Sequence, residues 1–191
     1  MKKTAYIIPG FTESPRQKVY QEIARTFQAK GVSPIPVPVK WRRKVMSDYT
    51  REFLKKYPSK KFARVYILGF SFGAVMAFLT TPTIRPKALI LCSLSPYFAA
   101  DIPLLKKSWK RLVGQKRLTD FKQYDFNKTA RQINCRTILL VGEKENQRVK
   151  DRVALANKRI KNSKLIVVPG SSHDIRNQKY LLAVKKVIRS L

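Results

Sequence analysis

The residue best suited to nucleophilic chemistry in this sequence is a serine between two glycines. Ser71 lies in the segment VYILGFSFGA, directly after a run of strand-forming residues and directly before a helix-like segment. A tight turn between strand and helix would hold the serine in a strained backbone conformation, with Gly69 and Gly73 leaving room for a neighbouring strand. The N–H of Phe72 would then point to where negative charge can develop on an oxygen. The pattern predicts a turn that presents a nucleophile.

The histidine that could serve this serine as a general base is the only one in the sequence. His173 lies in LIVVPGSSHD, after the last apolar run and before the last amphipathic one. Functional loops of a parallel sheet gather at the carboxyl ends of its strands, and both Ser71 and His173 follow an apolar run. The simpler alternative is a surface histidine in a polar loop.

The pentapeptide GFSFG, residues 69–73, resembles the Gly-x-Ser-x-Gly nucleophile elbow of the α/β-hydrolase superfamily. The pentapeptide alone is weak evidence, because it also occurs in ordinary glycine turns. In the superfamily the acid and then the histidine follow the serine, each after a later strand, and His173 fits this order. The resemblance implies that Ser71 is the nucleophile and His173 the general base.

The resemblance also implies an acid in the loop LVGEKEN, residues 140–146, where many relatives have Gly-x-x-Asp. Alignment on Gly142 gives this position to Glu145, a glutamate in place of the more frequent aspartate. Glu143 in the same loop remains a competitor. Asp174 ranks third, because adjacent side chains such as those of His173 and Asp174 seldom face each other well enough for this hydrogen bond.

An oxyanion hole in the superfamily uses two backbone N–H groups, and Phe72 would supply one of them. The loop PGFT, residues 9–12, resembles the family's His-Gly-x turn, with proline in place of histidine. Phe11 would supply the second N–H, and Gly10 would permit the bend. The alternative is a turn that only ends a strand.

Short apolar runs alternate with longer amphipathic ones along the chain, which predicts a mainly parallel six-stranded sheet covered by helices on both faces. The fold class is α/β, a three-layer sandwich of the α/β-hydrolase type. The expected strands are Ala5–Pro9, Ser33–Val39, Val65–Leu68, Ala88–Ser93, Thr137–Val141 and Leu165–Val168. Five helices are expected. The first follows an N-cap at Ser14, and the second follows an N-cap at Ser47 and ends at Pro58. The other three begin at Phe72, Gln147 and Ile175.

We expect one domain over residues 1–191, with a short insertion at about 96–134 in the place where relatives carry a cap. Leu105, Trp109 and Leu112 fall on one predicted helical face, with basic residues largely on the others. One interpretation is a packed surface helix. The other is a small lid whose apolar face covers an acyl chain and whose basic face meets an anionic group or membrane.

The charge is strongly positive, since 41 Lys and Arg against 11 Asp and Glu give +30. Such a surface attracts nucleic acid, anionic lipid and acidic substrates. The basic residues are nevertheless scattered over every expected helix and loop, and no zinc-ligand spacing or RNA-binding aromatic motif accompanies them. A compositional bias of the source explains this pattern equally well.

The residues therefore favour a serine hydrolase, most economically a carboxylesterase, which cleaves an ester, or a thioester or amide, through an acyl-enzyme. No metal or organic cofactor is expected, and the partner would be a small acyl substrate that can be anionic. Serine at the elbow argues against the dehalogenase and epoxide hydrolase branches, which use aspartate there. The alternative is a non-catalytic basic binding or scaffold protein on the same fold that contacts nucleic acid.

No window approaches the roughly 18 apolar residues that span a bilayer, and the N-terminal apolar run is too short for a secretory signal, so we expect a cytoplasmic protein. Cys92 and Cys135 would lie at opposite ends of neighbouring strands, which makes a disulfide between them improbable.

Overall fold

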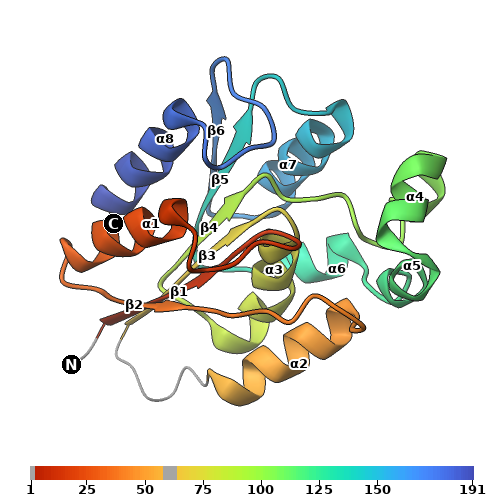
Figure 1. Ribbon diagram of the computed structural model, residues 1–191, viewed down its shortest axis with the longest axis horizontal. Helices are drawn as coiled ribbons and strands as arrows, with labels where there is room; N and C mark the ends of the chain where they lie inside the picture. The colour runs from red at the N-terminus through yellow and green to blue at the C-terminus, as the bar shows by residue number, and fades with distance from the viewer. Residues whose placement is uncertain (1–2, 58–63) are drawn as a thin grey trace.

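A single parallel sheet of six strands forms the centre of the computed structural model, which describes residues 3–57 and 64–191. The strand order is β2-β1-β3-β4-β5-β6, and every neighbouring pair is parallel (Figure 1). The strands are β1 (Lys3–Ile8), β2 (Ser33–Pro36), β3 (Arg64–Phe70), β4 (Ala88–Cys92), β5 (Arg136–Gly142) and β6 (Ser163–Val168). The predicted α/β fold class is confirmed.

Helices cover both faces of this sheet, as the continuous apolar strands predict. Ala5 and Ile7 of β1 pack into one apolar cluster, whereas Tyr6 and Ile8 pack into the other. The first cluster includes residues of α1 (Lys18–Gln28) and α8 (Gln178–Arg189). The second includes residues of α2 (Met46–Lys56), α3 (Phe72–Ile84) and α7 (Gln147–Arg159). The three layers are visible in Figure 1, with α1 and α8 on one side and α3 and α7 on the other.

Two predicted helix starts are wrong. Ser14 does not cap α1, which begins at Lys18; the Ser14 hydroxyl instead accepts the N–H of Arg16 at 3.2 Å. Ser47 does not cap α2 either, because α2 already begins at Met46, and the Ser47 hydroxyl donates to Asp120 at 2.5 Å. Serine caps only when its backbone is extended at the junction, and here both side chains find other partners.

Two further boundaries differ from the prediction by three residues each, whereas the other strand ends differ by at most two. The second strand ends at Pro36 instead of Val39, where alternating prolines remove ladder donors, although the N–H of Val37 still donates to Ile7 at 2.9 Å. The last helix begins at Gln178 instead of Ile175, after Asn177, whose side chain accepts two backbone N–H groups. The predicted helix end at Pro58 lies outside the described residues.

The segment 96–134 is helical, as predicted, and connects β4 to β5. It contains a 3-10 turn, η2 (Ile102–Leu104), and the helices α4 (Lys107–Val113), α5 (Gln115–Phe121) and α6 (Phe126–Arg131). Figure 1 shows α4 and α5 standing apart from the sheet, on the side of α3 and α6. The predicted common face is wrong for Leu112, which is 71% exposed, while Leu105 is buried.

Both cysteines are free thiols. Cys92 ends β4 and pairs in register with Leu140, whereas Cys135 lies just before β5 begins, so the two thiols lie at opposite ends of these neighbouring strands. Burial raises the pKa of both thiols. Among the helices of the described segments, none has the length and apolar character to cross a bilayer.

Candidate active site

The loops that hold the predicted site residues leave the carboxyl ends of the strands. The chain passes from β1 to β2 on one side of β1 and returns to β3 on its other side, so the connections diverge between β1 and β3. Open parallel sheets bind ligands at such a switch point. Phe11 follows β1 and Ser71 follows β3, which places both beside this divergence.

Ser71 has the strained backbone predicted for it. Its φ of 55° and ψ of −116° lie outside the regions that side chains favour, and it directly precedes the first residue of α3. The Ser71 N–H donates to the carbonyl of Cys92 at 2.9 Å, which continues the β3–β4 pairing into the turn. This anchoring to β4 holds the hydroxyl at the sheet edge.

The two glycines of the elbow are needed because backbone atoms approach them closely. A Cβ on Gly69 would lie 2.3 Å from the carbonyl oxygen of Gly73. A Cβ on Gly73 would lie 2.3 Å from the oxygen of Pro9 and 2.4 Å from that of Ile8. The elbow therefore packs directly against the end of β1, as the sequence predicted.

The imidazole of His173 lies between a hydroxyl and a carboxylate. Its Nε2 is 2.9 Å from Ser71 Oγ, and its Nδ1 is 2.7 Å from Oε2 of Glu145. The Phe70 ring also contacts the imidazole, with its centroid 5.2 Å from that of His173. This geometry lets the imidazole accept the Ser71 proton while the carboxylate fixes the tautomer that carries hydrogen on Nδ1.

The Glu145 carboxylate accepts two hydrogen bonds besides its contact with His173. Its Oε1 accepts the Gly142 N–H at 2.8 Å and the Ser93 hydroxyl at 2.5 Å. The Tyr180 hydroxyl lies 2.7 Å from Ser93 Oγ and 3.1 Å from the carbonyl oxygen of Leu140. Sequence reasoning missed Ser93 and Tyr180, although Ser93 follows β4 at the same sheet edge as the other loops.

The competing carboxylates point elsewhere. Glu143 accepts the N–H of Gly170 at 2.7 Å, which ties its loop to the one after β6. Asp174 pairs with Arg176 at 2.8 Å, and this pairing lowers the pKa of Asp174. Of the three candidates, Glu145 is the one that reaches the imidazole.

The turn after β1 is fixed by residues that the sequence did not single out. The N–H of Gly10 donates to Glu13 at 2.8 Å and to the Tyr20 hydroxyl at 3.0 Å, and that hydroxyl also contacts Glu13. Burial raises the pKa of Tyr20, which keeps it a donor. The Phe11 side chain, which follows, lies with its ring centroid 4.9 Å from that of Phe72.

A second serine lies beside Ser71. The buried Ser95 places its Oγ 3.2 Å from Ser71 Oγ, so the Ser71 oxygen has both His173 and Ser95 as neighbours. The residue follows β4 in the loop SLSP, and no sequence motif pointed to it.

Aromatic rings form one flank of this site. The Phe72 ring centroid lies 4.6 Å from that of Tyr97 and 6.2 Å from that of Trp41. Burial raises the pKa of Tyr97 to about 12, so its hydroxyl stays neutral. Phe98, which follows Tyr97, packs on Phe78 and Phe126 within the core.

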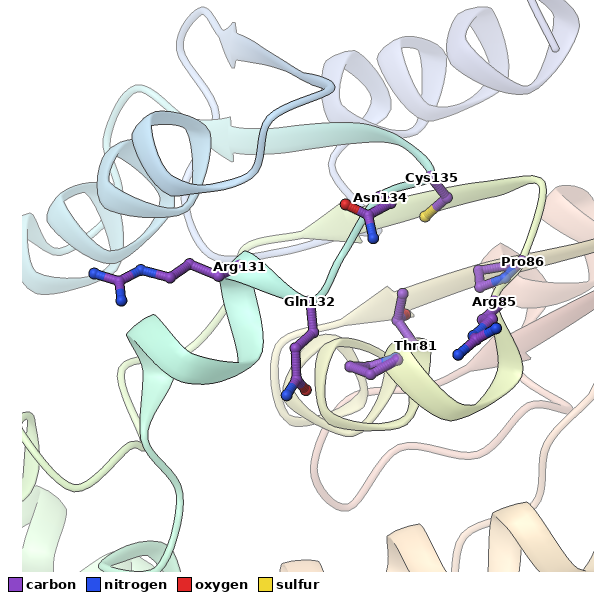
Figure 2. Close-up of a pocket in the computed structure, with 8 residues that line it drawn as sticks. Thr81, Arg85, Pro86, Arg131, Gln132, Asn134 and Cys135 are labelled. Carbon is purple, nitrogen blue, oxygen red and sulfur yellow. The ribbon is translucent and has the colours of Figure 1, made fainter.

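A cavity of about 890 Å³ lies at the other end of the sheet, near the amino ends of β4 and β5. Figure 2 shows Arg85 and Cys135 among its lining side chains, with Arg131 extended away from them. This cavity is separate from the loops that carry Ser71 and His173. Within residues 3–57 and 64–191, no group of three or more His, Cys, Asp or Glu side chains is arranged to hold a metal ion.

No protein-family model and no curated protein sequence matches this chain. Several solved structures resemble it over nearly its whole length. Est1E from Butyrivibrio proteoclasticus, solved with ferulic acid bound, aligns with a TM-score of 0.80 at 18% identity, covering 98% of this chain and 88% of that one. Mouse alpha/beta hydrolase domain-containing protein 10 aligns at 0.82 and 11% identity, covering 98% and 88%. A hydrolase described as putative from Agrobacterium vitis aligns at 0.81 and 16% identity, covering 99% and 87%.

Proposed function

On the α/β-hydrolase fold that this chain adopts, we propose that it is a serine hydrolase that cleaves carboxylic esters. The observation that carries the proposal is the position of His173, with Nε2 2.9 Å from Ser71 Oγ and Nδ1 2.7 Å from Glu145. The names of structural neighbours, which include esterases, support the same reaction class.

In the first half of the reaction, Ser71 Oγ attacks the ester carbonyl carbon while its proton passes to His173 Nε2. Glu145 stabilises the resulting imidazolium through Nδ1. The carbonyl oxygen becomes an oxyanion, for which the N–H groups of Phe11 and Phe72 are the proposed donors. Collapse of this intermediate breaks the bond to the alcohol oxygen, which takes the proton from His173.

In the second half, a water molecule attacks the acyl-enzyme while His173 accepts its proton. The carboxylic acid leaves, and the proton returns to Ser71 Oγ. This route needs no metal and no organic cofactor. An ester is favoured over an amide because an alkoxide leaving group demands less of the general acid than an amine does.

The segment 96–134 is the proposed cap. It supplies Tyr97 and Phe121, whose rings lie 4.6 and 5.7 Å from that of Phe72. Since Phe72 directly follows Ser71, an acyl chain bound beside the hydroxyl would meet this aromatic flank. The small-molecule substrate would therefore present an apolar acyl part.

A panel of 4-nitrophenyl esters of increasing acyl length, assayed with the wild type and Ser71→Ala, tests the proposal. We expect hydrolysis by the wild type and a loss of about 10³-fold or more in kcat in the variant. Hydrolysis that is unchanged in Ser71→Ala would remove Ser71 as nucleophile. Steeply salt-dependent nucleic-acid binding, with no ester cleaved, would favour the non-catalytic alternative.

A further inference from the structure

Two arginines are packed against aromatic rings on the side of the sheet that carries segment 96–134, and they differ in how their charge is balanced. Arg152 forms an ion pair with Asp101 and stacks over the ring of Phe126 at 4.0 Å. Arg117 donates to the carbonyl oxygens of Trp41 and Val113, which are neutral. Among the residues that the structure describes, no carboxylate lies within ion-pair distance of Arg117.

The guanidinium of Arg117 lies over the side chain of Phe11, a residue of the turn that would form part of the oxyanion hole. Its central carbon is 5.0 Å from the centroid of the Phe11 ring, and Phe11 is a proposed donor to the oxyanion. The same ring contacts Phe72, whose centroid is 4.9 Å away. A residue of α5 thus brings a full positive charge from the proposed cap to the turn that follows β1.

Around Phe11 two buried N–H groups lack an acceptor within the described residues. One is Nε of Arg117, and the other is Nε1 of Trp41, whose ring centroid lies 5.8 Å from that of Phe11. A buried donor without an acceptor is unfavourable, and the partly buried charge of Arg117 without a counter-charge adds to that cost. The contact with Phe11 offsets only part of that cost. A carboxylate would complement the charge and the spare hydrogen-bonding capacity of the guanidinium, which suits planar two-oxygen groups.

We propose that Arg117 is a specificity-determining residue that selects esters carrying a carboxylate near the scissile bond. The inference rests on the proposed serine hydrolase function and adds a substrate class to it. The anionic group belongs either to the acyl part or to the leaving group, and both sources supply the same carboxylate to Arg117.

The overall charge of +30 gives any anionic substrate a favourable approach, so the test must separate a local contact from long-range attraction. Salt screens charges that are more than about 10 Å apart at 0.1 M, whereas a contact with a half-buried guanidinium is screened much less. Lys116, the exposed neighbour of Arg117 on α5, allows the same charge to be removed without touching Phe11.

The experiment compares two pairs of substrates at 0.05 and 0.5 M salt. The first pair is the 4-nitrophenyl monoester of adipic acid and its methyl ester, which place or remove the anion in the acyl part. The second pair is 4-acetoxybenzoate and 4-acetoxybenzamide, which do so in the leaving group. The readout is the ratio of kcat/KM for the anionic over the neutral member, measured for wild type, Arg117→Gln, Arg117→Lys and Lys116→Gln.

We expect a wild-type preference for the anionic member of at least one pair that persists at 0.5 M salt. The ratio should fall roughly 10- to 100-fold in Arg117→Gln, the loss expected of one hydrogen bond to a charged group, and recover in part in Arg117→Lys. It should stay unchanged in Lys116→Gln. A merely structural role for Arg117 would lower both members of a pair equally.

A wild type that shows no anionic preference, or one that 0.5 M salt abolishes, overturns the inference whether or not Arg117→Gln folds. An unchanged ratio in Arg117→Gln also overturns it, while Ser71-dependent cleavage of the neutral esters would leave the proposed function intact. If the wild type cleaves none of the four substrates and none of the simple esters, the proposed function fails and the substrate class fails with it.

Discussion

The Glu145 carboxylate contacts the His173 imidazole, whereas two other candidate carboxylates do not. Asp174 is adjacent to His173 in the sequence, and Glu143 lies in the same loop as Glu145. The Oε2 atom of Glu145 is 2.7 Å from Nδ1, while Oε1 is occupied by Gly142 and Ser93. A carboxylate held from both sides has little freedom to rotate. It is therefore placed to fix the tautomer and orientation of the ring.

The change Glu145→Gln is expected to lower kcat for a 4-nitrophenyl ester by about 10²- to 10⁴-fold, because an amide does not stabilise the imidazolium. The matched variant is Glu143→Gln, which removes a charge two residues earlier from a side chain that contacts Gly170. It should retain kcat within about threefold. Steady-state kinetics on both purified variants measures these values. A large loss of kcat in Glu143→Gln, with kcat retained in Glu145→Gln, would assign the acid to Glu143.

The serine, the histidine and the loop of the acid could be predicted from the sequence, because each depends on local chemistry or on the order of the strands. The elbow needs a strained serine between residues without side chains, and the order of serine, acid and histidine follows from strands that all run in one direction. The sequence does not decide between Glu143 and Glu145 as the acid, since both follow β5 within three residues. Which one faces His173 is decided by Ser93 and Gly142, which lie 50 and one residues from Glu143 along the chain.

Helix starts were less predictable than strands for a related reason. Ser14 and Ser47 are common capping residues, but a local pattern does not reveal that Ser47 finds Asp120, 73 residues away, as its partner. Likewise, no local pattern reveals that Arg117 packs over the ring of Phe11, which is far from it in the sequence. Contacts between distant loops follow from the tertiary fold, which strand and helix periodicity specify only coarsely.

The change Gly73→Ala should disrupt the elbow, because the new methyl group would lie 2.3 Å from the backbone oxygen of Pro9. Neither the β1 terminus nor α3 can shift without disturbing the sheet. We expect a loss of roughly 3 kcal/mol in the free energy of unfolding, together with a loss of esterase activity. Urea denaturation followed by circular dichroism measures the first effect.

Gly31→Ala is the matched control for that change. Gly31 has a φ of 66° but nothing within 4 Å of an added Cβ, so only backbone strain opposes the substitution. The expected cost is about 1–2 kcal/mol, with activity retained. Equal costs at the two positions, with activity kept in Gly73→Ala, would show that the close approach at the elbow is unimportant.

The ion pair between Arg152 and Asp101 should be strongly coupled, because both side chains are buried. Asp101→Asn leaves a buried guanidinium without its counter-charge, for which we expect a loss of about 3–5 kcal/mol in stability. The double variant Asp101→Asn with Arg152→Met should recover most of that loss. Thermal unfolding of the wild type, the two single variants and the double variant measures the coupling. If the stability losses of the two single variants simply add in the double variant, this account is contradicted.

Alkaline pH should destabilise the fold through its buried tyrosines. Burial raises the pKa of Tyr97 from 10.0 to about 12, and it also raises the pKa of Tyr180. A raised folded-state pKa means that the unfolded chain loses these protons first. The contribution to stability is thus complete below pH 10 and is lost between pH 10 and about 12 for Tyr97.

Absorbance at the tyrosinate band, recorded with circular dichroism over the same pH range, checks this expectation. Ionisation of the buried tyrosines should coincide with loss of secondary structure. If Tyr97→Phe titrates like the wild type, and all tyrosines ionise near pH 10 with the fold intact, the burial argument is wrong.

The central claim is that the Ser71 hydroxyl is the group that becomes acylated. Wild-type protein treated with a fluorophosphonate and digested for mass spectrometry should carry one adduct, on the peptide containing Ser71, and His173→Ala should slow its formation by about 10³-fold or more. Ser71→Ala should remain unlabelled. An adduct on another residue, or labelling of Ser71→Ala at the wild-type rate, would contradict the account.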